Sequence, residues 1–149
     1  MKIKNNETMN DLENFTPHFS FKEMTRTDTG IENIIPQKDY ATIVGNIDRL
    51  CRTVLEPVRR MLDVPMIVTS GYRSKKVNEA VGGVKNSMHL HGCACDFSVG
   101  EKHKNVLAWH LIKTSQIPFD VVILEKNGEW IHISIARNGK NRRLAVEYK

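Results

Sequence analysis

The stretch Asp120-Val-Val-Ile-Leu-Glu-Lys-Asn-Gly-Glu-Trp-Ile-His-Ile-Ser-Ile135 decides the fold class of this sequence. Two runs of apolar residues lie on either side of Asn127-Gly128, a dipeptide typical of two-residue β-hairpin turns. Polar and apolar residues alternate in the second run, as they do in a strand with one buried face. The stretch therefore predicts an antiparallel hairpin with strands at 120–125 and 129–135.

Upstream of this hairpin, the sequence predicts mostly helices. Apolar residues three and four positions apart over 40–62 predict a helix with one buried stripe, and Pro57 either bends it or begins a second helix. The other elements that we expect are a strand at 66–69, a helix at 74–81, a strand at 93–99, a helix at 104–115 and a last strand at 143–148. Because the helices come early and an antiparallel sheet comes late, the fold class is α+β.

Length and composition agree with one folded domain. The chain has 149 residues, of which 40% are hydrophobic and 26% charged, and these values exclude the disordered and low-complexity classes. We expect a flexible tail at 1–16 and a single domain at 17–149. No apolar run approaches the roughly 20 residues of a membrane span. Because residues 1–12 form no secretory signal, we expect a cytoplasmic protein that is freed by lysis, exported without a signal peptide or carried in a virion.

The net charge limits the classes of partner that the sequence allows. Lysine and arginine total 22 against 17 acidic residues, a net charge of +5 that suits nucleic acid or an anionic cell-wall polymer. Because the sequence has no clustered basic helix or aromatic–basic ladder, we expect no nucleic-acid partner.

The odd number of cysteines, Cys51, Cys93 and Cys95, predicts structural thiols rather than disulfides or metal ligands.

Two histidines and one aspartate form a candidate metal site. His89 and Asp96 lie in Ser87-Met-His-Leu-His-Gly-Cys-Ala-Cys-Asp96, and His132 lies in the second strand of the hairpin. Imidazole and carboxylate are donors that suit Zn²⁺, and three protein ligands leave a fourth position open for water. Strand alternation places Asp96 on the face opposite the two neighbouring cysteines, and His132 on the face opposite its isoleucine neighbours. Three donors in one pattern predict a catalytic zinc site.

These segments resemble a known family. The sequence is similar to the zinc D-alanyl-D-alanine carboxypeptidases and L-alanyl-D-glutamate endopeptidases that cut peptidoglycan stem peptides, above all to small phage and prophage members, and hedgehog domains share their fold. The resemblance covers about 19–145 and is most specific in Ser-x-His-x-x-Gly-x-Ala-x-Asp together with Trp-x-His. The other matching stretches are Phe19–Thr25, Val54–Arg59, Val68–Ser74, Val77–Gly83 and Phe119-Asp120. This resemblance implies a hedgehog/DD-peptidase-like fold, a central antiparallel sheet with helices packed on one side.

The resemblance also implies roles for residues at matching positions. The three donors become ligands of Zn²⁺, and Arg73 becomes the cation that binds the scissile carbonyl or a substrate carboxylate. Trp130 becomes a contact for the substrate, a peptidoglycan stem peptide. For Ser87 two interpretations stay open, since it either contacts substrate or a ligand or only shapes its loop. The implied reaction is metal-assisted hydrolysis of a peptide bond.

The general base is a choice between two glutamates. Glu129 fits the Glu-x-x-His pattern that many members of the family carry. Hairpin register favours Glu125 instead, because Glu125 faces Trp130 and lies on the face of His132. In the same register Glu129 faces Lys126 and lies on the opposite face. The hedgehog branch has its glutamate at the position of Glu125, and we favour Glu125 while keeping Glu129 as the alternative.

A second class of function stays open beside the enzyme. A zinc-holding domain of this fold that no longer cuts would recognise cell wall or a partner protein. The complete set of three ligands, an arginine and at least one glutamate favours a zinc-dependent metallopeptidase. We expect it to act as a monomer. The sequence leaves open whether the bond that is cut is the terminal D-Ala-D-Ala bond or the internal L-Ala-D-Glu bond.

Overall fold

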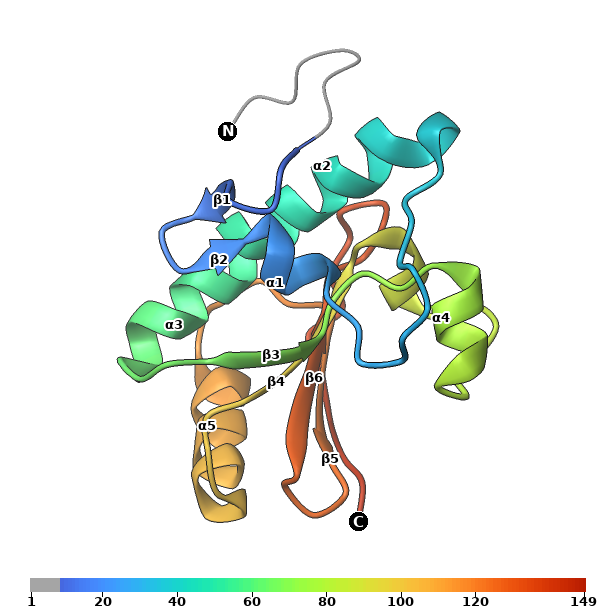
Figure 1. Cartoon of the computed structure of the whole chain (residues 1–149). Helices are drawn as coiled ribbons and strands as arrows, with labels where there is room; N and C mark the ends of the chain where they lie inside the picture. Colours follow the sequence, from blue (N-terminus) through green and yellow to red (C-terminus); the bar gives the residue numbers. More distant parts are fainter. Residues whose placement is uncertain (1–8) are drawn as a thin grey trace.

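Five strands form the central sheet of the computed structural model, which describes residues 9–149 (Figure 1). They are β3 (Ile67–Ser70), β4 (Ala94–Ser98), β5 (Val121–Glu125), β6 (Trp130–Ser134) and β7 (Leu144–Glu147), in the order β3-β4-β6-β5-β7. A short hairpin of β1 (Asn14–Thr16) and β2 (Phe19–Ser20) precedes them. The helices are α1 (Phe21–Thr25), α2 (Tyr40–Leu50), α3 (Glu56–Leu62), α4 (Lys75–Ala80) and α5 (Lys102–Thr114), with shorter helical turns η1 (Gln37–Asp39), η2 (Cys51–Leu55) and η3 (Met88–His91). The predicted α+β class is confirmed.

The strands β3, β4, β6 and β5 are antiparallel to their neighbours, whereas the edge strand β7 runs parallel to β5. The sequence predicted only antiparallel strands, and the segment after β6 causes the difference. This segment passes the start of β5, where Leu144 donates its backbone N–H to the Asp120 carbonyl at 2.8 Å. Because β7 begins at the same end as β5, the two strands run in the same direction.

One face of the sheet forms the hydrophobic core with the longer helices. Cys95 of β4 and Ile133 of β6 are fully buried and belong to one cluster with residues of α2, η2, α3 and α5. Trp109 of α5 also donates its indole N–H to the Val122 carbonyl of β5 at 3.3 Å. Figure 1 shows α5 and α4 on opposite sides of β5 and β6. The long helices thus cover one face, as predicted, and the opposite face carries the polar side chains described below.

The helix predicted over 40–62 is one helical path built from α2, η2 and α3. Pro57 has no backbone N–H, so the regular hydrogen-bond ladder loses a donor there. The Glu56 backbone N–H bonds to the Cys51 carbonyl, five residues back, which makes η2 a π-helical turn. Pro57 lies in the first turn of α3, and the chain stays helical from η2 into α3, so the proline is accommodated by the π-helical turn before it without ending the helical path. None of the helices among residues 9–149 is both long and apolar enough to cross a membrane.

The tail predicted at 1–16 does not extend as far as residue 16. Residues 1–8 lie outside the described part of the chain, but residues 14–16 form β1 and pair with β2. Phe15 is buried in the main core, and Met9 donates its backbone N–H to the Tyr40 hydroxyl at 2.7 Å. The prediction was wrong at residues 14–16 because strands of three and two residues leave too short a pattern to recognise.

The hairpin of β5 and β6 has the register that the sequence predicts. Glu125 is the partner of Trp130, and Ile123 is the partner of His132. Partners in an antiparallel ladder point to the same face of the sheet. Glu125 and His132 therefore both point away from the core.

The turn of this hairpin differs from the prediction. Four residues form it rather than two, and the backbone N–H groups of Gly128 and Glu129 both donate to the Glu125 carbonyl. The helix α5 holds the loop in place, since Asn105 donates to the carbonyls of Gly128 and Glu129 at 2.9 and 3.2 Å. The expected rung between Lys126 and Glu129 is not formed, because these contacts with α5 replace it.

Candidate active site

Three side chains from three different elements meet on the open face of the sheet. His89 comes from η3, Asp96 from β4 and His132 from β6, and their donor atoms all lie within 4.8 Å of one another. Asp96 and His132 are direct partners in the β4–β6 ladder, which places both side chains on one face. Ser87 caps η3, since its hydroxyl accepts the His89 backbone N–H at 3.2 Å. The fold thus brings together the three residues that the sequence predicts as metal ligands.

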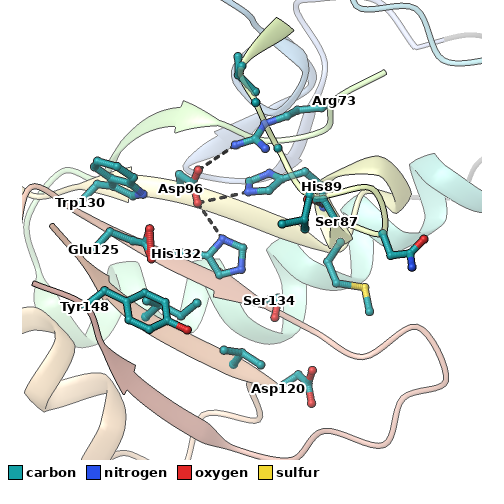
Figure 2. Close-up of a pocket in the computed structure, with 18 of the residues that line it drawn as sticks. Arg73, Ser87, His89, Asp96, Asp120, Glu125, Trp130, His132, Ser134 and Tyr148 are labelled. Carbon is teal, nitrogen blue, oxygen red and sulfur yellow. Dashed lines mark hydrogen bonds and ion pairs between the residues drawn. The ribbon is translucent and has the colours of Figure 1, made fainter. Parts of the chain in front are cut away.

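The Asp96 carboxylate lies between the two imidazoles. Its Oδ1 is 2.9 Å from Nδ1 of His132 and 3.3 Å from Nε2 of His89 (Figure 2). Neighbouring ligand atoms of a tetrahedral Zn²⁺ site with bonds of 2.0–2.1 Å are about 3.3 Å apart. The two distances from Asp96 are therefore close to the spacing that one such ion requires, and all three donors lie within 4.8 Å of one another.

A backbone carbonyl fixes the tautomer of His89. Its Nδ1 lies 2.7 Å from the Gly71 carbonyl oxygen, which can only accept a hydrogen bond, so Nδ1 carries the proton. In the neutral ring, Nε2 then directs a lone pair at the Asp96 carboxylate, 3.3 Å away. Two lone pairs at this distance repel each other unless a cation lies between them. The donor set and the tautomer fit a divalent metal ion.

Asp96 is a buried carboxylate that the two histidines keep ionised. Burial by itself would raise the pKa of the carboxyl, but the imidazoles of His132 and His89 beside it outweigh burial and hold this pKa well below its usual range. One charged carboxylate and two imidazoles are a ligand set of the kind that catalytic zinc sites use. The electrostatics of the site therefore favour a bound cation.

Arg73 is held beside these donors by three acceptors. Its Nε donates to Ser70 Oγ at 2.9 Å, its Nη1 to Asn78 Oδ1 at 3.2 Å and its Nη2 to Asp96 Oδ2 at 3.2 Å. The side chain is 14% exposed. Burial lowers the pKa of the Arg73 guanidinium, and the Asp96 charge opposes that change. Arg73 is therefore a fixed cation at the edge of the site.

Gly83 leaves the space that this arrangement needs. A Cβ at Gly83 would lie 2.0 Å from Asn78 Oδ1 and 3.1 Å from Nη1 of Arg73. Asn78 is buried and also donates through Nδ2 to the Val84 carbonyl at 2.9 Å. Asn78 thus joins the loop after α4 to the guanidinium, and only a glycine at position 83 fits against it.

A cleft of about 720 Å³ opens over the donors and Arg73. Glu125, Trp130 and Tyr148 lie at one end of it, and Ser134 and Asp120 lie at the other (Figure 2). This volume is typical of sites that bind small ligands or short peptides. Because the donors face the cleft, the site resembles an open catalytic metal site more than a closed structural one.

The two candidate bases lie in different places. Glu125 lines the cleft, on the same face of the sheet as His132. Glu129 lies in the hairpin loop with its side chain 49% exposed, and its carboxylate is 3.9 Å from the Lys102 ammonium of α5. The structure therefore brings Glu125 to the cleft and leaves Glu129 outside it.

The comparison with known families agrees with this arrangement. Residues 17–134, most of the chain, match the family described as Peptidase M15. The chain belongs to the peptidase M15 family. Members of this family are zinc-dependent, which agrees with the donor set found here. No curated protein matches the chain closely enough to be named as a relative.

Besides Arg73, the two other predicted substrate contacts, Ser87 and Trp130, also line the cleft of this M15 peptidase. Ser87 is buried and lines the cleft, and its hydroxyl caps η3 by accepting the His89 backbone N–H. This hydrogen bond supports the loop-shaping role. Trp130 stands next to Glu125 with the Lys126 ammonium 5.3 Å from its ring centroid. Contact of either side chain with substrate stays a prediction.

Several residues of this M15 cleft are not predicted from the sequence. Tyr148 lies beside Glu125 and Trp130. No sequence pattern predicts this position, because it depends on the pairing of β7 with β5 in the tertiary fold. Asp120 and Arg142 form an ion pair at the other end, with Nη2 2.9 Å from Oδ2. The Phe119-Asp120 stretch carries part of the family resemblance, and that was the signal available for Asp120.

Proposed function

We propose that this M15 peptidase is a zinc-dependent hydrolase of peptide bonds in peptidoglycan stem peptides, of the D-Ala-D-Ala carboxypeptidase or L-Ala-D-Glu endopeptidase type. One observation carries the proposal: the three histidine and aspartate donors lie in a cleft that also holds Glu125 and Arg73. A closed structural metal site needs neither a cleft nor an additional carboxylate. In this proposal the protein acts as a monomer, since one chain supplies every group.

Each group has a chemical task in the proposed reaction. Zn²⁺ held by His89, Asp96 and His132 would supply Lewis-acid chemistry, which acidifies a water molecule and polarises the scissile carbonyl. Glu125 accepts the proton of the attacking water and passes it to the leaving amine, and general acid–base catalysis requires both transfers. Trp130 and Ser87 border the space for the substrate.

Arg73 supplies positive charge where the reaction develops negative charge. Its guanidinium has five N–H donors, and the acceptors on Ser70, Asn78 and Asp96 engage three of them. The other donors bind the oxyanion at the scissile carbonyl or a carboxylate of the substrate. Because the guanidinium is already fixed, this interaction needs no reorganisation at the moment of reaction.

Mass spectrometry of purified peptidoglycan tests the proposal. The zinc-loaded protein is incubated with peptidoglycans of several chemotypes, beside Glu125→Gln and, as the matched control, Glu129→Gln. We expect release of D-Ala or of stem-peptide fragments, and the masses identify the bond that is cut. Release should stop in Glu125→Gln and continue in Glu129→Gln.

The same experiment addresses the alternative of a binding module. If the protein retains one zinc ion per chain but releases no fragment from any chemotype, the hydrolase proposal is wrong. Cosedimentation with the same peptidoglycans would then show whether the domain recognises the wall without cutting it.

A further inference from the structure

A second groove of about 530 Å³ continues from the cleft at its Asp120 end. The two hollows share the side chains of Met88, Asp120 and Arg142, so they form one continuous path over the surface. Arg137 and Lys140 line the part that lies beyond the cleft. We call this second hollow, lined by Arg137, Lys140 and Arg142, the basic groove.

Unpaired positive charge distinguishes the basic groove. Arg142 is engaged with Asp120, since its Nε and Nη2 lie 3.0 and 2.9 Å from the two carboxylate oxygens. The side chains of Arg137 and Lys140 have no hydrogen-bond or ion-pair partner among residues 9–149. Two cations without partners beside a neutralised ion pair favour the binding of an anion.

Strand geometry gives the distance from the metal site to this groove. Trp130, His132 and Ser134 alternate onto the cleft face of β6 at a spacing of about 7 Å. Asp120, at the start of the groove, donates its backbone N–H to the Ser134 carbonyl at 2.7 Å. The groove therefore begins about one such step beyond His132. An extended peptide advances about 3.3 Å per residue, so two of its residues cover that step.

We propose that the basic groove binds a carboxylate of the substrate peptide, two residues away from the bond that is cut. The inference rests on the proposed function and specifies its substrate class, an acidic peptide rather than a neutral one. Guanidinium and ammonium groups bind carboxylates through charge-assisted hydrogen bonds. Trp130 and Tyr148 at the opposite end of the cleft are aromatic, so the two ends favour different parts of the substrate and fix its direction.

Two synthetic pentapeptides test this subsite with the zinc-loaded protein. Both are L-Ala-γ-D-Glu-L-Lys-D-Ala-D-Ala, in which the glutamate lies two residues before the residue pair of the D-Ala-D-Ala bond, and they differ only in whether the α-carboxyl of the glutamate is free or a carboxamide. Cleavage at the L-Ala-D-Glu bond instead would put this carboxylate next to the cut bond and overturn the proposed spacing. The variant is Arg137→Gln/Lys140→Gln. Arg142 is left in place because its loss would strand the buried Asp120 carboxylate. The matched control, Lys104→Gln/Lys113→Gln, removes the same charge from exposed positions on α5.

We expect the wild type to hydrolyse the free acid with a KM about tenfold below that of the carboxamide. The groove variant should raise the KM of the acid about tenfold, leave kcat unchanged and leave the carboxamide unaffected. Added salt should weaken only the preference for the acid. The α5 control should behave as the wild type.

Equal KM values for the two peptides in the wild type, or an equal effect of the groove variant on both, would overturn the subsite. If neither peptide is cut, the proposed hydrolysis of this substrate is wrong, but the subsite proposal is still tested. Calorimetry then measures whether the groove binds the free acid more tightly than the carboxamide. A preference for the acid that disappears in Arg137→Gln/Lys140→Gln supports the subsite, and binding without preference refutes it.

Discussion

Glu125 and Trp130 are partners at the last rung of the β5–β6 hairpin, and their side chains share the cleft face of the sheet. Glu129 lies in the loop just beyond this rung, with its carboxylate near Lys102 on the other side. Glu129 is closer to His132 in sequence, yet Glu125 is the one that reaches the cleft. Position along the strand, and not sequence spacing, therefore decides between the two glutamates.

Replacing Glu125 by Gln should lower kcat by about 10²–10⁴-fold, because the amide no longer accepts a proton from the attacking water. The zinc content should stay that of the wild type, since Glu125 is not one of the three donors. Glu129→Gln is the matched control and should retain wild-type turnover. Release of D-Ala or peptide fragments gives kcat, and elemental analysis gives zinc. An active Glu125→Gln together with an inactive Glu129→Gln would reverse the assignment.

Removing the metal should abolish hydrolysis and lower the Tm. An ion that binds only the folded state stabilises it by about 4 kcal/mol at a concentration 1,000 times its Kd. Calorimetry of the wild type and of His132→Ala, each with added zinc and after chelation, measures this stabilisation. The zinc-dependent shift in Tm should be large in the wild type and nearly absent in the variant. A shift of the same size in both proteins would place the ion away from His132.

Gly83→Ala should disturb Arg73 while leaving the metal site filled. The new methyl group would collide with Asn78 Oδ1, and moving Asn78 removes an acceptor from the guanidinium. We expect kcat/KM to fall at least about tenfold with unchanged zinc content. Lys85→Ala, at an exposed position in the same loop, is the control. An unchanged kcat/KM in Gly83→Ala would show that the position of Arg73 does not matter for the reaction.

Local patterns account for the parts of the site that the sequence could predict. The Asn127-Gly128 dipeptide and the alternation around His132 were enough to give the register of β5 and β6. Alternation in β4 likewise separates Asp96 from the cysteines beside it. These features depend on residues close in sequence, so the alternation of polar and apolar residues is enough to predict them.

Features that depend on distant contacts could not be predicted in this way. The hairpin loop widens because Asn105 of α5 binds its carbonyls, and β7 is parallel because the chain passes the start of β5. Tyr148 reaches the cleft only as a consequence of that pairing. Each of these contacts joins residues far apart in sequence, and neither propensity nor spacing encodes such a contact.

The three cysteines should be unreactive in the native protein. Burial raises the pKa of the thiols of Cys51, Cys93 and Cys95, so little thiolate is present near neutral pH. A chromogenic disulfide reagent should label them slowly in buffer and completely in denaturant. Because all three are buried in the core, fast labelling of any one would mean that the core opens locally around it on the time scale of the assay.

The ion pair of Asp120 and Arg142 should make stability depend on pH at the acid end. Hydrogen bonds from Arg142 hold the pKa of the Asp120 carboxyl below its usual 3.8. The Asp120 carboxylate therefore binds a proton less readily in the folded state than in the unfolded state. The stability that the ion pair adds is present in full above about pH 5 and is lost as the pH falls through the lowered pKa. Asp120→Asn should cost about 1–2 kcal/mol at pH 7 and progressively less below pH 4, measured by urea unfolding. Asp28→Asn, which breaks an exposed pair with Arg26, should cost less than about 0.5 kcal/mol at either pH. A deficit in Asp120→Asn that stays constant down to pH 3 would mean that the pair does not lower this pKa.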